Sequence, residues 1–286
     1  MLDRDFTLKK DKELCDTILT SGYMTLTMSE YLAKKELYKD SKFVILRHDI
    51  DNKVDLHIAL KMAEYEYSVG IKSSYYFRTV KDVFDINVIK NVVEYGHEVG
   101  YHYEVLNESK GDIELAFALL EENLNKFRKI TSINTICQHG GSLGENTAST
   151  FKGLIKTVFK FINGRIEIKS YKSNDIWKER DFIEFGLLGE AYLSLDFTDI
   201  IYISDTGLRW DGYKNRVLDV VNSDYYRDGK TFAKTTSQLI ELLKNNEYIQ
   251  FNILAHPANW IDSFFPWFKW QLLQKFRNVG KKILLK

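Results

Sequence analysis

Cysteine is scarce in this chain of 286 residues, where only Cys15 and Cys137 occur. Two cysteines without a C-x-x-C spacing exclude a disulfide-rich secreted scaffold and a zinc or redox motif of that kind. We expect both thiols to be reduced, in a cytoplasmic protein. Residues 1–5 are charged and contain no apolar core segment, so no signal peptide is expected.

The chain also lacks an excess of charge of one sign. Its 40 Lys and Arg residues balance 40 Asp and Glu residues, so no overall field draws it to nucleic acid, and no nucleic-acid partner is expected. Only two prolines occur, and no run reaches the roughly 18 apolar residues of a membrane span. A composition with 44% hydrophobic and 28% charged residues excludes a disordered or fibrous chain.

Short apolar runs alternate with amphipathic helical patterns along the chain. Residues 42–49 form a nearly unbroken apolar run, which is typical of a strand covered on both faces in a parallel sheet. Further strands are predicted at 72–78, 97–103, 133–138, 191–195, 200–204 and 248–255. Helices are predicted at 54–69, 85–95, 113–129, 148–161 and 232–245. This alternation predicts βαβ units with right-handed crossovers.

The predicted fold is therefore α/β, a distorted or incomplete parallel (β/α) barrel of about seven strands. We expect a single domain over residues 1–286. Within it, residues 140–199 form a divergent insertion or lid, and residues 260–286 form an aromatic and basic C-terminal helix.

Polar residues stand at the carboxyl ends of the predicted strands, where active sites lie in parallel α/β folds. The first strand ends in R-H-D-I-D at 47–51, the third in H-Y-E at 102–104, the fourth in Q-H-G-G at 138–141, and the last in H-P at 256–257. A further strand, 200–204, leads into Asp205, with Arg209 and Trp210 close behind.

The two-residue period of a strand sorts these side chains. Asp49 and Asp51 share a face and His48 points the other way, while His102 and Glu104 share a face that His97 does not. Two carboxylates facing imidazoles from other strands predict a divalent metal site, because Asp oxygen and His nitrogen are ligands for zinc or a similar ion. One carboxylate would bind the ion, and the other would stay free as a base. The ion would lower the pKa of bound water from about 15.7 toward ~7.

The same residues resemble the motifs of the polysaccharide deacetylases, metal-dependent carbohydrate esterases of the NodB-homology kind. Residues 47–51 are similar to the family's T-F-D-D-G motif, and residues 96–106 (G-H-E-V-G-Y-H-Y-E-V-L) to its G-H-E-I-G-N-H-T-x-x-H motif. Residues 138–141, the pair Asp205 and Trp210, and residues 253–256 resemble the third, fourth and fifth motifs. The resemblance is strongest to the branch found among capsule and lipopolysaccharide biosynthesis proteins.

This resemblance implies a distorted (β/α)₇ barrel that hydrolyses an N-acetyl group on a sugar. It makes Asp49 the general base, Asp51 and His102 metal ligands, His256 the general acid and Asp205 its electrostatic support. The implied cofactor is a divalent metal ion, with zinc expected. The implied substrate is a sugar or a nucleotide- or lipid-linked glycan, handled in the cytoplasm or at the inner membrane surface.

The sequence departs from the family pattern at Leu106, where a second metal-binding histidine is expected. His139 could replace it, and Glu104 is another candidate ligand. The spacing of Asp49 and Asp51 also leaves their roles as base and ligand interchangeable. Glu104 is further predicted to contact substrate.

Plainer explanations exist for several of these residues. Asp49 and Asp51 could cap the helix that follows them, and His102 and His139 could be structural. Arg209 is a further candidate for the catalytic set, where Asp205 and Arg209 could hold the substrate, or the two could form a plain loop salt bridge. Trp210 could stack on a sugar ring or belong to the core.

The C-terminal tail is aromatic and basic, which suits a helix lying in a membrane interface. The alternative, which we favour from the sequence, is that these aromatic residues pack on the barrel or on a partner subunit. Two other functions stay open: hydrolysis of another C–N bond, such as an amide or formyl group, and a catalytically inactive barrel that binds glycan. Leu106 is the reason to consider the inactive barrel.

Overall fold

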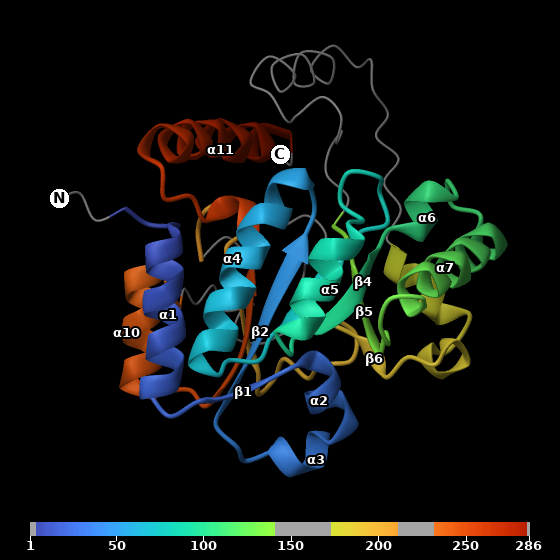
Figure 1. Cartoon of the computed structure of the whole chain (residues 1–286), viewed down its shortest axis with the longest axis horizontal. Coiled ribbons are helices and arrows are strands. Elements are labelled where there is room, and N and C mark those ends of the chain that lie inside the picture. The colour runs from blue at the N-terminus through green and yellow to red at the C-terminus, as the bar shows by residue number, and fades with distance from the viewer. Residues whose placement is uncertain (1–3, 141–172, 211–231, 285–286) are drawn as a thin grey trace.

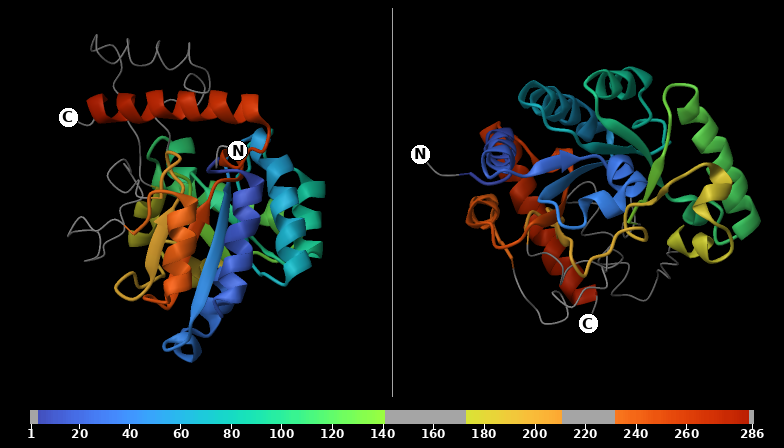
Figure 2. Two further views of the ribbon diagram at one scale, coloured as in Figure 1. Left: turned by 90° about the vertical axis from the view of Figure 1, so that its left-hand side faces the viewer. Right: turned by 90° about the horizontal axis from the view of Figure 1, so that it is seen from below.

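The computed structural model describes residues 4–140, 173–210 and 232–284. Its centre is a curled, all-parallel sheet with the strand order β6-β5-β4-β3-β2-β8-β7 (Figures 1 and 2). The strands are β2 (Phe43–Ile50), β3 (Ser74–Phe77), β4 (Glu98–Tyr103), β5 (Thr135–Gln138), β6 (Gly189–Glu190), β7 (Ile201–Ser204) and β8 (Gln250–Ala255). A short strand, β1 (Met24–Leu26), pairs with the first half of β2. The terminal strands β6 and β7 do not pair within the described residues, so the prediction of an incomplete parallel barrel is confirmed.

Helices surround this sheet. The longer ones are α1 (Leu8–Thr20), α4 (Lys53–Val69), α5 (Ile86–Glu94), α7 (Ile113–Arg128) and α10 (Thr236–Asn245). Shorter ones are α2 (Met28–Ala33), α3 (Lys35–Tyr38), α6 (Val105–Glu108) and the 3₁₀ turns η1 (Ser173–Lys178), η2 (Phe182–Phe185) and η4 (Pro257–Asn259). The last helix, α11 (Phe264–Leu284), lies across the end of the barrel toward which the arrow of β2 points (Figures 1 and 2). None of the helices in the described residues is both long and apolar enough to cross a bilayer.

Most predicted elements are present within a few residues of their expected limits. The strand expected at 191–195 is wrong, because these residues form a turn after β6. The Glu190 carboxylate accepts the backbone N–H groups of Tyr192 and Leu193 at 2.7 and 2.8 Å, which closes the turn. The elements before residue 42 were not predicted. The helix expected at 148–161, and most of the predicted insertion or lid, lie outside the described residues; the predicted domain description otherwise stays a prediction.

Alternate residues of β2, β7 and β8 face two different cores. Ile45 and Leu254 join Tyr76, Cys137 and Tyr202 in a cluster that reaches across the curl from β3, β5 and β7. The residues between them, such as Val44 and Leu46 of β2, pack instead with α1 and α10. This alternation explains the unbroken apolar run of β2, since both of its faces are covered. Its last residues, which turn polar, reach the site.

A buried charged cluster joins α4 to the sheet behind the site. The Glu66 carboxylate of α4 lies 2.7 Å from His48 Nε2 and accepts hydrogen bonds from Tyr75 and Ser73 at 2.8 and 2.5 Å. His97 Nδ1 lies 3.0 Å from the Ser73 hydroxyl. Burial alone would raise the pKa of Glu66, but the nearby His48 and these hydrogen bonds hold it at about 2. His48 and His97 are therefore structural, as their strand faces predicted.

Removing this charge should destabilise the fold. We expect Glu66→Gln to lower the free energy of unfolding by about 3 kcal/mol at neutral pH, because it breaks a buried ion pair and leaves His48 without a counter-charge. The measurement is urea unfolding followed by circular dichroism, with the exposed Glu64→Gln on the same helix as control.

The contribution of Glu66 to the free energy of unfolding should depend on pH. The pKa of Glu66 lies below its ordinary value of 4.5, so its stabilising contribution is complete above about pH 4.5 and disappears as the pH falls through about 2. The difference between wild type and Glu66→Gln should therefore shrink over that interval. A difference that stays constant down to pH 2 would contradict the assignment.

Candidate metal centre

The carboxylate of Asp51 is the meeting point of three imidazoles. Asp51 directly follows β2, and its Oδ1 lies 3.2 Å from His102 Nε2 and 3.5 Å from His139 Nε2. Its Oδ2 lies 3.9 Å from His256 Nε2. The histidines belong to β4 and to the residues directly after β5 and β8. The expected convergence of distant strand ends in one place is therefore confirmed, whereas the roles assigned to these residues stay predictions.

The backbone around Asp51 is fixed by the start of α4. Asn52 caps this helix, and the side chain of Asp55 accepts the N–H groups of Asp51 and Asn52 at 3.0 and 2.8 Å. Asp55 also accepts the N–H of Ala258, which ties the loop after β8 to the same corner. The alternative that Asp49 and Asp51 serve as helix caps is therefore wrong, because Asn52 is the cap. Both carboxylates are left for the site.

The ring orientations of two histidines are set by partners on their far side. His102 Nδ1 lies 3.0 Å from the backbone oxygen of Cys137, and His139 Nδ1 lies 3.2 Å from Glu104 Oε2. These acceptors require a proton on each Nδ1, and they leave Nε2 as the ring atom that faces Asp51. Two acceptor atoms 3.2 Å apart, such as His102 Nε2 and Asp51 Oδ1, need a proton or a cation between them. Asp51 Oδ1 is buried and has no hydrogen-bond partner among the described residues.

Glu104 supports His139 from behind, a role that the sequence did not predict. Arg78 donates two hydrogen bonds to Glu104 Oε1, one of 2.9 Å from Nε and one from Nη2. Burial would raise the pKa of Glu104, but His139 and Arg78 hold it at about 2. Its carboxylate is thus charged and engaged on both oxygens. The predicted substrate contact of Glu104 stays a prediction.

Asp49 lies deeper and is held by an arginine of its own strand. Arg47 Nη2 donates to Asp49 Oδ2 at 3.0 Å and to the Tyr192 hydroxyl at 2.6 Å. The guanidinium is fully buried and stands 4.5 Å from the centre of the Tyr192 ring. Asp49 Oδ1, like Arg47 Nε and Nη1, has no hydrogen-bond partner among the described residues. Sequence reasoning missed Arg47, although its position two residues before Asp49 places both side chains on one strand face.

His256 is held by Asp205 on the opposite side. His256 Nδ1 and Asp205 Oδ1 are 2.6 Å apart, and Asp205 Oδ2 accepts the His256 N–H at 3.0 Å. Asn259 and Trp260 donate to the same Oδ2 at 2.9 and 3.1 Å. Burial would lower the pKa of His256, but the neighbouring Asp205 raises it to about 10. His256 is therefore a protonated imidazole with Nε2 turned toward Asp51.

Three further candidates lie elsewhere. Trp210 is only 3% exposed and donates from Nε1 to Thr236, with its ring 5.9 Å from that of Trp260. This burial contradicts the expected sugar contact and supports the core alternative. Arg209 is exposed in the turn after β7. Leu106 is buried in α6 and packs in a hydrophobic cluster, so His139 is the residue that completes a third ligand position.

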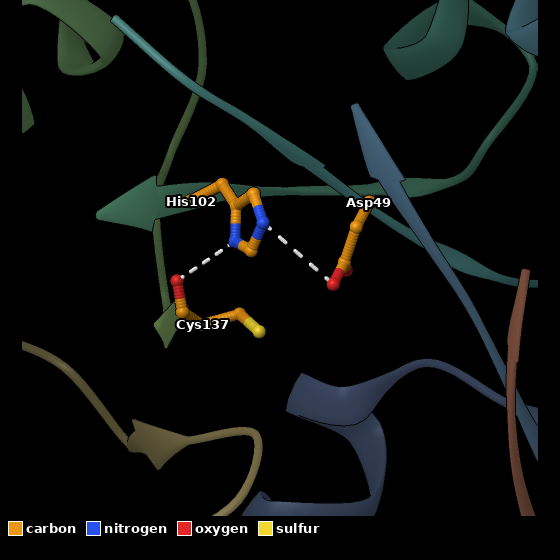
Figure 3. A group of neighbouring side chains, drawn as sticks. All are labelled: Asp49, His102 and Cys137. Atoms are coloured by element: carbon orange, nitrogen blue, oxygen red, sulfur yellow. Dashed lines mark hydrogen bonds and ion pairs between the residues drawn. The ribbon is translucent and has the colours of Figure 1, made fainter. Parts of the chain in front are cut away.

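Cys137 extends the centre inward. The Cys137 sulfur, an Asp49 oxygen and a His102 nitrogen all lie within 4.8 Å of one another, and the three side chains are buried (Figure 3). Asp51, His102 and His139 meet the same criterion. The centre thus offers two groups of ligands that share His102. The outer group contains only oxygen and nitrogen, and the inner one adds a soft sulfur.

Comparisons with known proteins add little to this geometry. A scan against protein-family models gives no match, and a search of curated proteins gives no relative. One solved structure that matches is a mutant of a CE4-family pseudoenzyme with restored enzymatic activity, at 13% sequence identity and a TM-score of 0.35. The match covers 84% of this chain and 64% of that chain. A likeness this loose assigns neither fold nor activity, so the assignment depends on the side chains themselves.

The geometry predicts how metal affinity responds to substitution. After treatment with a chelator, we expect wild type to bind one zinc ion by titration calorimetry, and Asp51→Asn to abolish this binding. Glu104→Gln should weaken it about 10- to 100-fold, since the residue behind a ligating histidine fixes its tautomer. The control is His57→Ala, which removes an exposed histidine of α4. Equal affinity in wild type and Asp51→Asn would exclude this site.

Proposed function

We propose that this protein is a metal-dependent hydrolase that removes an N-acetyl group from a sugar in surface-polysaccharide biosynthesis, of the lipopolysaccharide or capsule kind. The observation that supports it is the set of three imidazoles around Asp51, with the separate carboxylate of Asp49 beside them. The resemblance of these residues to polysaccharide deacetylase motifs points to the same chemistry.

The residues fit a divalent ion. Asp51, His102 and His139 would hold it, and three protein ligands leave a coordination position open, as catalytic zinc sites do. A cation would take the place of the protons between Asp51 Oδ1 and the Nε2 atoms that face it. When bound, the ion polarises the acetyl carbonyl and lowers the pKa of water. Zinc is the proposed metal, since it accepts oxygen and nitrogen ligands in this number.

Asp49 is the proposed general base, which resolves the interchangeable roles of the two carboxylates. Its Oδ2 is held by Arg47, while its Oδ1 is free to accept a proton from the attacking water. The hydrogen bond from Arg47 keeps the carboxylate of Asp49 in one orientation. Asp51, in contrast, is surrounded by imidazoles and is the better ligand.

His256 is the proposed general acid. Its Nε2 points toward the centre and carries a proton that Asp205 stabilises through Nδ1. Water adds to the acetyl carbon as Asp49 takes its proton, and the carbon–nitrogen bond then breaks. The leaving nitrogen takes a proton from His256 Nε2, and the products are acetate and the free amino sugar. Base and acid thus come from different strands, β2 and the end of β8.

The substrate is proposed to be a nucleotide- or lipid-linked N-acetyl sugar, and the compartment to be the cytoplasm. Leu106 is the reason to consider an inactive barrel, and this reason weakens if His139 is the third ligand beside Asp51 and His102. Hydrolysis of a formyl or other amide group would use the same residues, so only a comparison of substrates distinguishes the acyl groups.

Acetate release tests this proposal. Zinc-loaded wild type should release acetate from a nucleotide-linked N-acetylhexosamine or from its lipid-linked form, and Asp49→Asn should reduce kcat about 10²- to 10⁴-fold, the range of general acid–base catalysis. Zinc binding should remain, because Asp49 does not belong to the outer ligand group. Asp82→Asn, at an exposed loop position, is the matched control.

Three results would contradict the proposal. Turnover of Asp49→Asn equal to wild type would remove Asp49 as base. Turnover of formyl or other amide substrates, with acetylated sugars untouched, would favour the alternative hydrolase. Tight glycan binding that a chelator does not affect, without any turnover, would favour the inactive barrel.

A further inference from the structure

The outward side of α11 carries a continuous stripe of large apolar side chains. Five residues form it, with exposed fractions of 81, 53, 48, 44 and 56% for Phe265, Phe268, Leu272, Phe276 and Val279, respectively. Their spacing of three and four residues places them on one face of the helix. We call these five residues the outer stripe. Single exposed hydrophobic residues are ordinary, but a row of them on one helix indicates a surface that contacts something.

All charged side chains of α11 are positive. The segment Phe264–Leu284 contains five Lys or Arg residues and no Asp or Glu, although the whole chain is neutral. Lys269 and Lys275 are exposed and adjoin Phe268 and Phe276 of the outer stripe. Aromatic rings flanked by lysines on a helix that cannot span a bilayer are typical of helices that lie in the plane of an anionic membrane surface.

The opposite face of α11 is fixed to the barrel. Trp267 Nε1 donates to the backbone oxygen of Asp5 at 2.7 Å, Trp270 Nε1 to Asn259 Oδ1 at 3.0 Å, and Asn278 to the backbone oxygen of Gly207 at 2.8 Å. These bonds hold the tryptophans inward. These tertiary contacts fix the rotation of α11 about its own axis. The outer stripe therefore faces away from the barrel.

The same contacts connect α11 to the candidate metal centre. Asn259, which accepts from Trp270, donates to Asp205, and Asp205 holds His256. The helix lies at the end of the barrel toward which β2 points (Figures 1 and 2). The centre lies at the same end, because Asp51 directly follows β2. A surface on which α11 rests would thus lie at the same end of the molecule as the residues proposed to react.

From these observations we propose that α11 is an interfacial helix whose outer stripe docks on a bilayer containing anionic lipid. Apolar side chains enter the boundary between headgroups and acyl chains, and Lys269 and Lys275 contact the headgroups. The docking itself is independent of catalysis. Its consequence, that the sugar substrate is carried on a lipid, rests on the function proposed above.

Vesicle sedimentation tests the docking. Wild type should bind phosphatidylcholine vesicles that contain phosphatidylglycerol, bind pure phosphatidylcholine much more weakly, and dissociate from the anionic vesicles at ~1 M salt, where surface charges are screened. The double variants Phe265→Ser with Phe268→Ser and Lys269→Glu with Lys275→Glu should each reduce binding at least ~10-fold. Ile183→Ser, at a position 78% exposed, and Lys244→Glu, at an exposed position, are the matched controls.

Several outcomes would overturn the proposal. Wild type that fails to bind anionic vesicles, or double variants that bind as well as wild type with unchanged thermal unfolding, would exclude the lipid surface. A concentration-dependent dimer that the Phe265 and Phe268 variant abolishes, in the absence of vesicle binding, would identify a second copy of this chain as the occupant.

Different results would refute the hydrolase proposal and the membrane-docking proposal. Asp49→Asn should bind vesicles like wild type, because docking does not use the base. Wild type that binds vesicles but releases no acetate would refute only the hydrolase. Acetate release from a lipid-linked sugar that is unaffected by the outer-stripe variants would refute the consequence drawn from the docking.

Discussion

The structure of the site depends on one requirement, which is that the charge of Asp51 must be balanced at the edge of the barrel. Burial would raise the pKa of this carboxyl, but the imidazoles of His102, His139 and His256 hold it well below its usual range. Each imidazole is positioned from behind by an acceptor, namely the Cys137 backbone oxygen, Glu104 or Asp205. The sheet brings these pairs together because the carboxyl ends of its parallel strands meet at one edge.

A second carboxylate in the same place is tolerated because it has its own cation. Asp49 and Asp51 lie on the same face of one strand end, and His102 Nε2 is 3.7 Å from one and 3.2 Å from the other. The fully buried Arg47 is the counter-charge of Asp49. The His102 imidazole therefore remains available to interact with Asp51. The separate counter-charges give the two carboxylates different environments. That difference is the physical basis for assigning one as a ligand and the other as a base.

The sequence predicted the sheet and the meeting of its polar ends, because unbroken apolar runs and the period of two are local signals. The sequence could not predict which side chains form hydrogen bonds or ion pairs with the residues of the site. Arg47 and Glu104 were both visible in the sequence, yet their partners depend on how β2 and β4 lie against neighbouring segments. Trp210 and the turn at 191–195 show the same limit: burial by Trp260 and closure by Glu190 are tertiary events that override local preference.

In the proposed centre the third ligand would be His139, and position 106 holds a leucine. In the resembling motif a histidine is expected there, but position 106 lies in α6 and packs into a hydrophobic cluster. His139 stands directly after β5, the neighbour of β4, and its N–H continues the parallel ladder by donating to the Tyr103 oxygen at 2.8 Å. The sheet register itself therefore places the replacement imidazole beside Glu104. A ligand fixed by strand register needs only one supporting acid, whereas a ligand on a separate short helix would depend on the packing of that helix as well.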